Sequence, residues 1–291
     1  MFQIITDSAV DITKEDALKH NVEVIPFYVS TDGQNFVKES EGFSKDEFFD
    51  KLINDKDVKP KSSQPNPQDY IEFYTSHLKE GRDILSLAIT SKLSGSYASA
   101  QIAAETLAEE YPDRKIMIVD TLNLTVGQIL LLDQVKKMRD AGFSLQETYE
   151  KAEKIKGTIH VYFVLETLEF LHRGGRIGGA AAFVGSILKL KPILQMYEGA
   201  VEKFESVRGT KNAIKRLYDL AVNAISEAKD DMEFCVGHIR NRDVAEEYKS
   251  GIEKAIGKSS AVDIVDIGTL IGVHAGPGAI AVSYCKKYDK V

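Results

Sequence analysis

The chain has 291 residues, enough for two domains, and 43% of them are hydrophobic, which is typical of a protein with a full buried core. Its 37 lysines and arginines against 44 aspartates and glutamates give a net charge of −7, which argues against nucleic-acid binding and against strong binding to anionic membranes. The most apolar segment, 177–194, contains Lys189, Lys191 and Pro192 and is too interrupted to span a bilayer. We recognise no N-terminal targeting signal and expect a cytoplasmic protein. Cys235 and Cys285 lie in apolar stretches and are expected to be buried thiols, not a disulfide or metal ligands.

The first half of the chain alternates short β-rich runs with helical patterns, which predicts a parallel α/β fold. The expected strands are Phe2–Thr6, Val22–Val29, Ile84–Ile89 and Ile116–Asp120. The expected helices are Lys14–His20, Lys45–Asn54 with Ser44 as its N-cap, Asp69–Lys79, Gly95–Tyr111 and a long helix that runs through Met138. With a further helix at Ser144–Lys156, this half forms an N-terminal domain of residues 1–156.

The pattern changes after Gly157, where we place a second α/β domain, residues 157–291, with a mixed sheet. Its expected strands are Ile159–Leu165, a hairpin over Ile193–Val207 that turns at Glu198-Gly199 on an exposed sheet edge, Glu233–Ile239 and Ala261–Ile267. Its expected helices are Thr210–Lys229 and Asp243–Ala255, and a glycine-rich segment, 268–284, closes the chain.

Three strands of the first domain are followed by polar turns, at Thr6–Asp11, Thr90–Ser96 and Asp120–Thr125. Ligands of open parallel sheets bind outside the carboxyl ends of the strands, near helix N-termini. The sequence therefore predicts that these serines and aspartates surround one crevice. Asp7 and Asp11 also have a simpler interpretation, as caps of the first helix.

Two hydroxyl-rich turns are candidates for binding an anion. Ser62 and Ser63 precede a helix, and Ser94-Gly95 lies between a strand and a helix, where hydroxyls and free backbone N–H groups can hold an anion. Each turn can equally be a helix cap. The second resembles a nucleophile elbow but lacks G-x-S-x-G, and catalysis by Ser94 would need a histidine held by an acid.

The segment Leu168–Leu194 places Arg173 and Arg176 among five glycines and continues into an apolar run. Arginine suits a carboxylate or phosphate, so an anion receptor beside an apolar wall points to an amphiphilic acid. The alternative is a tight loop before an ordinary buried helix. His274, in the glycine-rich stretch 272–278, is interpreted as part of a functional loop, and Arg208 as an exposed cation next to a helix start. Asp7 and Asp120 lack further ligands at metal-binding spacing, so we expect no metal and no cofactor.

Taken together, these segments resemble the DegV family, fatty-acid-binding proteins that serve as B-subunits of bacterial fatty acid kinase. The matching segments run in the family's order and cover nearly the whole chain. They are ITDSAVDIT (Ile5–Thr13), SSQPNPQDY (Ser62–Tyr70), SKLSGSYASA (Ser91–Ala100), VDTLNLTVGQ (Val119–Gln128), FLHRGGRIGGAAAFVGSILKLKPIL (Phe170–Leu194) and IGVHAGPGAIAV (Ile271–Val282).

The resemblance implies a two-domain α/β protein that buries one long-chain fatty acid between its domains. It implies that hydroxyls matching Ser62 and Ser94 hold the carboxylate, and that residues matching Arg208 and His274 lie near the carboxylate or the partner kinase. The family's turn usually reads TSQPS, whereas this chain has Ser62 in place of threonine and Asn66 in place of the last serine. Ser62 keeps the hydroxyl, so we expect carboxylate binding to survive.

On this basis the chain is a non-catalytic carrier that presents the carboxylate of a fatty acid to a separate ATP-dependent kinase, which makes acyl-phosphate for phospholipid synthesis. The carboxylate is expected to bind Ser62, Ser63, Ser94, Gly95 and His274. The acyl chain is expected to lie beside Ile177, Phe183, Ile187, Leu188 and Leu194, with helix Ala180–Leu188 as a lid. Arg173, Arg176 and Arg208 are expected to face the kinase, a phosphate or, transiently, a membrane surface.

Two other functions stay open at this point. The first is a serine hydrolase of lipid esters, with Ser94 as nucleophile and His274 as base. The second is a nucleotide or sugar-phosphate binder that uses the loop Gly174–Gly179, which mimics a dinucleotide motif only loosely.

Overall fold

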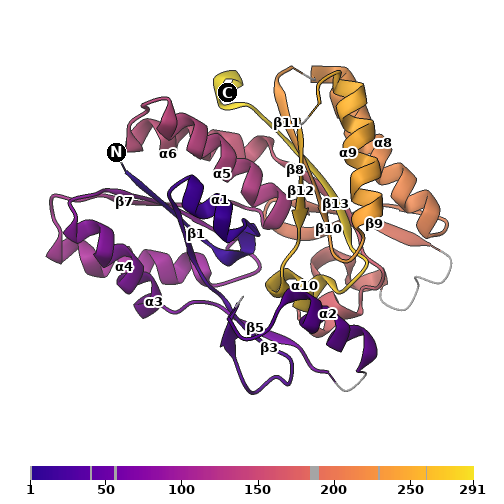
Figure 1. The fold of residues 1–291 in the computed structure, drawn as a ribbon, viewed down its shortest axis with the longest axis horizontal. Helices are drawn as coiled ribbons and strands as arrows, with labels where there is room; N and C mark the ends of the chain where they lie inside the picture. The colour runs from indigo at the N-terminus through magenta and orange to yellow at the C-terminus, as the bar shows by residue number, and fades with distance from the viewer. Residues whose placement is uncertain (1, 40, 56–57, 184–189, 229, 260) are drawn as a thin grey trace.

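The computed structural model contains a four-stranded and a six-stranded sheet, each built by one half of the chain, and a small three-stranded sheet in the first half (Figure 1). It describes residues 2–39, 41–55, 58–183, 190–228, 230–259 and 261–291. The four-stranded sheet is parallel, with the order β2-β1-β6-β7. Its strands are β1 (Gln3–Asp7), β2 (Val22–Ile25), β6 (Ile84–Ala88) and β7 (Ile116–Asp120). The sequence therefore predicted the parallel arrangement of the first half correctly.

The six-stranded sheet is mixed, with the order β10-β9-β8-β13-β11-β12 and one parallel pair, β11 with β12. Its strands are β8 (His160–Val164), β9 (Lys191–Tyr197), β10 (Ala200–Val207), β11 (Met232–His238), β12 (Val262–Asp266) and β13 (Ile280–Lys286). The hairpin of β9 and β10 turns at Glu198 and Gly199 and provides one edge of the sheet, as predicted.

Helices cover both faces of the four-stranded sheet and of the six-stranded sheet (Figure 1). Helices α3 and α4 pack on one face of the four-stranded sheet and α1 and α6 on the other, while α8 and α9 cover the outer face of the six-stranded sheet. Helix α5 contacts β11 and β13 from the opposite side and so lies between the two halves. These helices are α1 (Lys14–Lys19), α2 (Lys45–Asn54), α3 (Pro67–Lys79), α4 (Ser96–Glu110), α5 (Thr125–Asp140), α6 (Leu145–Ile155), α7 (Glu169–Arg173), α8 (Thr210–Ala228), α9 (Arg242–Ile256) and α10 (Thr269–Ala275).

The local signals account for most of these boundaries. Ser44 caps α2 with a complete capping box, in which its side chain accepts from Glu47 N and Glu47 accepts from Ser44 N. Ser144 caps α6 in the same way. Both cysteines are buried and free, as predicted. No described helix is long and apolar enough to cross a membrane.

Three of the predicted elements are wrong. The run Val22–Val29 is not one strand, because Pro26 has no N–H for a ladder and the chain divides into β2 and β3 (Tyr28–Ser30). Strand β3 forms a separate three-stranded sheet with β4 (Val37–Lys38) and β5 (Lys61–Ser63), so part of the expected turn at Ser62 is a strand. Residues 269–275 form helix α10 and not a loop, and Gly276, at φ +71°, ends it.

The expected lid and caps also need correction. Residues Gly178–Phe183 form a 3₁₀ helix, and Ile187 and Leu188 lie outside the described residues. Asp7 caps the 3₁₀ turn Ser8–Val10, whereas the N-cap of α1 is Thr13. Asp11 instead reaches across to the second half of the chain, where its Oδ1 accepts from Gly268 N at 2.8 Å.

One hydrophobic cluster joins the two halves. It contains Ile4 and Leu87 of the first sheet together with Val161 and Cys285 of the second, and α5 contributes Leu131. Separate clusters lie under α8 and α9 and under α3 and α4. The central cluster contains most of the apolar residues that line the cavity described below.

Candidate functional site: an apolar cavity with one polar end

A cavity that is partly open to solvent is lined by residues from both halves of the chain. Most of the lining is apolar and includes Phe27, Ile89, Val161, Phe163, Met196, Leu270, Ile271 and Ala281. The polar lining residues come from β5 and the residue after it, from the turns after β6 and β7, from the segment after α7 and from α10; they are Ser62, Gln64, Ser94, Thr125, Arg176 and His274. The cavity therefore suits a ligand with a long apolar part and a polar group.

Ser62 and His274 meet at the polar end of the cavity. Ser62 Oγ lies 2.8 Å from His274 Nε2, although the two residues are 212 positions apart. Strand β5 pairs with β3, Ser62 opposite Val29, and successive residues of a strand point to opposite faces. Ser62 therefore points into the cavity, whereas the exposed Ser63 does not line it.

Ser94 is held beside them by Gln64. Gln64 Oε1 accepts from Gly95 N at 2.6 Å and lies 3.5 Å from Ser94 Oγ, which itself accepts from Ser96 N at 3.2 Å. Ser94 thus lines the cavity, and its hydroxyl also accepts from the first N–H of α4, whereas anion binding by this turn stays a prediction. Gly95 contributes its N–H to Gln64 and not to the cavity. Gln64 was not among the predicted site residues. The feature of the sequence that could have identified it is a long amide side chain within the Ser62 turn.

Arg176 closes the same end of the cavity. Its Nε donates to Leu93 O at 3.1 Å and its Nη1 donates to Gly174 O at 2.6 Å, so it ties the second half of the chain to the Ser94 turn. Burial, helped by the nearby Arg176 charge, lowers the pKa of His274 to about 4. His274 is therefore neutral at pH 7, and Arg176 is the cation at this end.

The glycines of the Arg/Gly segment allow close packing inside the protein. A Cβ at Gly174 would collide with His274 Nδ1, and a Cβ at Gly178 would collide with Val201 O. A Cβ at Gly179 would collide with the Glu202 carboxylate, a group that repels phosphate. These contacts disfavour the loop as a nucleotide or sugar-phosphate cradle and favour its role in positioning Arg176 and His274.

The other two arginines lie away from the cavity lining. Arg173 is exposed, with Nε 3.8 Å from Glu169 Oε1 and its guanidinium over the Phe170 ring. Arg208 is exposed at the end of β10, and neither residue is among the described residues that line the cavity. Arg176 is thus the one of the three predicted arginines that lines it.

The apolar wall differs from the prediction. Ile177 and Leu194 are buried in the central cluster and Phe183 packs against it, yet the described lining of the cavity does not include them. The wall comes instead from strands β8 and β13 and from helix α10. The reason is that the 3₁₀ segment Gly178–Phe183 packs on β10, whereas α10 packs toward the first half of the chain.

The buried Asp7 carboxylate accepts hydrogen bonds from the polar turns. Asp7 accepts from Ile89 N at 2.8 Å, from Ser96 Oγ at 3.1 Å and from Gln128 Nε2 at 3.1 Å, and so ties three elements together. Burial raises the pKa of Asp7 to about 6 despite these donors.

Within the described residues no group of three or more His, Cys, Asp or Glu side chains is placed to hold a metal ion.

Known proteins resemble this chain over its full length. The family model for uncharacterised proteins of the DegV family matches residues 1–287. A DegV domain-containing protein of Clostridium perfringens is 33% identical over 287 residues, which cover 97% of each chain. The structure of a stearic acid-binding protein from Eubacterium ventriosum matches with a TM-score of 0.92, 29% identity and complete coverage of both chains. A fatty-acid-binding DegV family protein from Thermus thermophilus matches with a TM-score of 0.87 and 31% identity, over 98% of this chain and 99% of that one. The chain therefore belongs to the DegV family.

Proposed function

We propose that this protein is a non-catalytic carrier that binds one long-chain fatty acid non-covalently between its two halves. The observation that carries the proposal is the apolar cavity, whose one polar end gathers Ser62, Ser94, Arg176 and His274. Fatty acids are bound by relatives of the same fold, including the Eubacterium ventriosum and Thermus thermophilus proteins.

The acyl chain supplies most of the affinity. Burial of roughly 14 methylenes at about 0.8 kcal/mol each contributes on the order of 11 kcal/mol before the costs of association. The polar end then has only to orient the carboxylate. The hydroxyls of Ser62 and Ser94 donate to it, Arg176 balances its charge, and the neutral His274 ring fixes the direction of the Ser62 hydroxyl.

The carboxylate at the polar end of the cavity is the group on which a partner would act. We infer that an ATP-dependent fatty acid kinase phosphorylates it there, and that the acyl-phosphate enters phospholipid synthesis. The exposed Arg173 and Arg208 are then available to the kinase or, transiently, to a membrane surface. In this system the carrier acts in the cytoplasm, without nucleic acid and without a cofactor of its own.

Native mass spectrometry of the purified protein, followed by solvent extraction, tests ligand binding. We expect an added mass that extracts as free fatty acid. A protein that stays at its bare mass after incubation with fatty acids would contradict the carrier function. The kinase step is tested separately by incubating loaded carrier, kinase and ATP with hydroxylamine, which traps acyl-phosphate as a hydroxamate. Product that forms equally well without the carrier would refute the presentation step.

The hydrolase alternative is disfavoured by the geometry. His274 contacts Ser62 and not Ser94, and among the described residues its Nδ1 has no acidic partner. A histidine whose pKa is about 4 is also a weak general base at neutral pH. We therefore expect no covalent labelling of Ser62 or Ser94 by a fluorophosphonate probe.

A further inference from the structure

Helix α10 is capped by side chains from the other half of the chain. The residue before α10 is Gly268, which has no side chain to cap the helix. Glu39 Oε1 accepts from Leu270 N at 2.7 Å, although the two residues are 231 positions apart, and it also accepts from Thr269 Oγ1 at 2.9 Å. Asp11 Oδ1 accepts from Gly268 N at 2.8 Å. An N-cap side chain normally accepts from the second or third helical N–H, so Glu39 takes the place of the missing N-cap side chain.

Glu39 is itself fixed to the first half of the chain. It directly follows β4, is 8% exposed, and its N–H donates to Phe27 O at 2.8 Å. Phe27 lines the cavity, whereas Glu39 is not among the described residues that do so. Glu39 can therefore influence the site only through the elements that it holds, and α10 is the one that its carboxylate binds.

The rest of α10 is also held by the first half of the chain. The helix packs against α2, β3 and β5 of that half and against α7 of the second half, and α2 lies beside it in Figure 1. A Cβ at Gly272 would collide with the Phe49 ring of α2. At the other end of the helix, His274 Nε2 lies 2.8 Å from Ser62 Oγ. Glu39 and Ser62 thus hold the two ends of α10.

The position of His274 depends on this cap. Helix α10 has seven residues, and helices of this length are not stable on their own in water. His274 lies five residues after Thr269, which is about 7.5 Å along the helix axis at 1.5 Å per residue. Within the described residues, Ser62 is the one hydrogen-bond partner of the His274 ring, because Nδ1 is unpaired. A first turn without its cap therefore lets the ring shift away from Ser62.

We propose that Glu39 is a positioning residue of the carboxylate site, and that its cap on α10 sets His274 against Ser62. This inference rests on the proposed fatty-acid-binding function. Without the cap, the His274 ring no longer fixes the direction of the Ser62 hydroxyl, and the carboxylate loses an oriented donor. The cap needs an accepting oxygen at position 39 and not a charge.

The test compares stearate with methyl stearate, which has the same chain but no carboxylate, by displacement of a fluorescent fatty acid. The ratio of the two affinities reports carboxylate binding, because a general loosening of the cavity lowers both affinities alike. We expect Glu39→Ala to lower this ratio about fivefold, as for the loss of one hydrogen bond. Glu39→Gln keeps the accepting oxygen and should keep the wild-type ratio. Glu41→Ala, at an exposed position two residues along the chain, is the matched control.

The NMR signals of the histidine rings provide a second readout. Burial, helped by the nearby Arg176 charge, lowers the pKa of His274 to about 4, and Glu39→Gln should leave this titration unchanged. In Glu39→Ala a ring displaced from Ser62 is better solvated, so its titration should move toward the ordinary histidine pKa of about 6.5. Loss of one signal in His274→Asn identifies the ring.

Each other outcome is decisive. An unchanged affinity ratio or an unchanged His274 titration in Glu39→Ala would overturn the inference, and so would an equal loss of affinity for both ligands. A Glu39→Gln variant as weak as Glu39→Ala would overturn it too.

Two further arms keep the test independent of folding and of the proposed function. If Glu39→Ala does not fold, Thr269→Val takes its place, because it removes one of the two donors to Glu39. Its ratio should fall about twofold, and an unchanged ratio would overturn the inference. Failure of the wild type to bind stearate would refute the proposed function itself, while the NMR comparison would still test whether Glu39 positions His274.

Discussion

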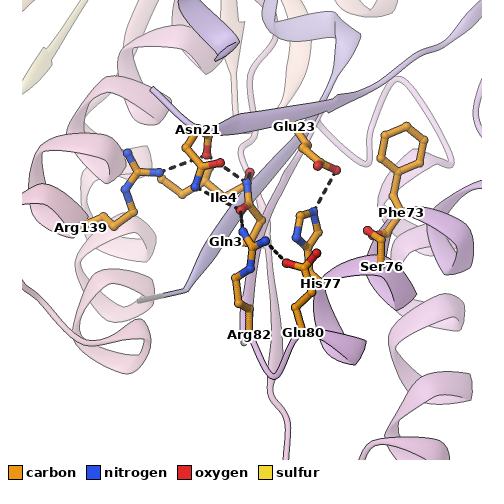
Figure 2. Close-up of polar contacts among 10 residues, drawn as sticks. All are labelled: Gln3, Ile4, Asn21, Glu23, Phe73, Ser76, His77, Glu80, Arg82 and Arg139. Atoms are coloured by element: carbon orange, nitrogen blue, oxygen red, sulfur yellow. Dashed lines mark hydrogen bonds and ion pairs between the residues drawn. The ribbon is translucent and has the colours of Figure 1, made fainter. Parts of the chain in front are cut away.

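The two ends of the four-stranded sheet use buried polar groups in opposite ways. At its amino end, Gln3 donates to Asn21 O at 3.0 Å and accepts from Arg82 Nη1 at 2.9 Å, and Arg139 donates to Asn21 O at 3.2 Å (Figure 2). At its carboxyl end, Gln128 Oε1 and His274 Nδ1 are buried without partners among the described residues.

At the amino end, Gln3 and Arg139 satisfy the Asn21 carbonyl, and Arg82 pairs with Gln3 and Glu80 (Figure 2). Under the proposed function, the unpaired groups at the carboxyl end are held for the ligand. An unpaired buried group costs about 1–3 kcal/mol, so a fold keeps it where something else supplies the partner. The four predictions below test whether the amino end serves stability and the carboxyl end serves binding.

Asp11→Asn gives the largest expected effect on stability at the carboxyl end. Burial, reinforced by nearby Glu39, raises the pKa of Asp11 from 3.8 to about 7, so the folded protein holds a proton that the unfolded chain releases. The Asp11 contribution to stability therefore falls by on the order of 4 kcal/mol as pH rises from about 4 to about 7. Above about pH 7 this contribution is constant.

The variant keeps the oxygen that accepts from Gly268 N but does not titrate. The melting temperature of the wild type should fall relative to that of Asp11→Asn as pH rises across this range, so that the two values converge or cross. The titrations of Asp7 and His274 are common to both proteins and cancel in the comparison. Parallel curves would show that Asp11 is ionised throughout.

Ala281→Phe should abolish most of the binding. Ala281 lies on β13, is 5% exposed and lines the cavity, so a phenyl ring there occupies the space of the acyl chain. We expect fatty-acid affinity to fall about a hundredfold, measured by ligand displacement. Ile102→Phe, on the exposed face of α4, should bind normally. Unchanged affinity in Ala281→Phe would place the acyl chain elsewhere.

Arg139→Ala should lower the stability of the protein and leave fatty-acid binding unchanged. The Arg139 side chain is 5% exposed and donates to two backbone carbonyls, of which the variant leaves His20 O without this donor while Asn21 O keeps Gln3. We expect the free energy of unfolding, from urea titration, to drop by about 2 kcal/mol, with unchanged fatty-acid affinity. A comparable loss of affinity would mean that the two ends of the sheet are coupled.

Ser62→Ala and Ser63→Ala form the smallest and most local test. The two serines are neighbours on β5, but only Ser62 lines the cavity. Ser62→Ala should weaken fatty-acid binding by about 1 kcal/mol, and Ser63→Ala should not change it. Equal affinities of the two variants would mean that Ser62 does not hold the carboxylate.

The sequence predicted the elements whose signals are local. Short β-rich runs located the strands, and Ser44 and Ser144 marked helix starts because a cap acts within one turn. The turns of Ser62 and Ser94 were also recognisable, since hydroxyls and glycine after a strand form a local pattern. Pro26 was a local signal as well, and it should have divided the predicted strand Val22–Val29.

Only the tertiary structure decided which of these residues form the site. The contact of Ser62 with His274 joins segments 212 residues apart, and no short-range pattern encodes it. The apolar wall was assigned to Ile177 and Leu194 because they are apolar, but burial alone does not distinguish core from cavity lining. Side-chain chemistry and periodicity are properties of the chain itself, whereas the shape of a cavity depends on how two sheets and α10 pack together.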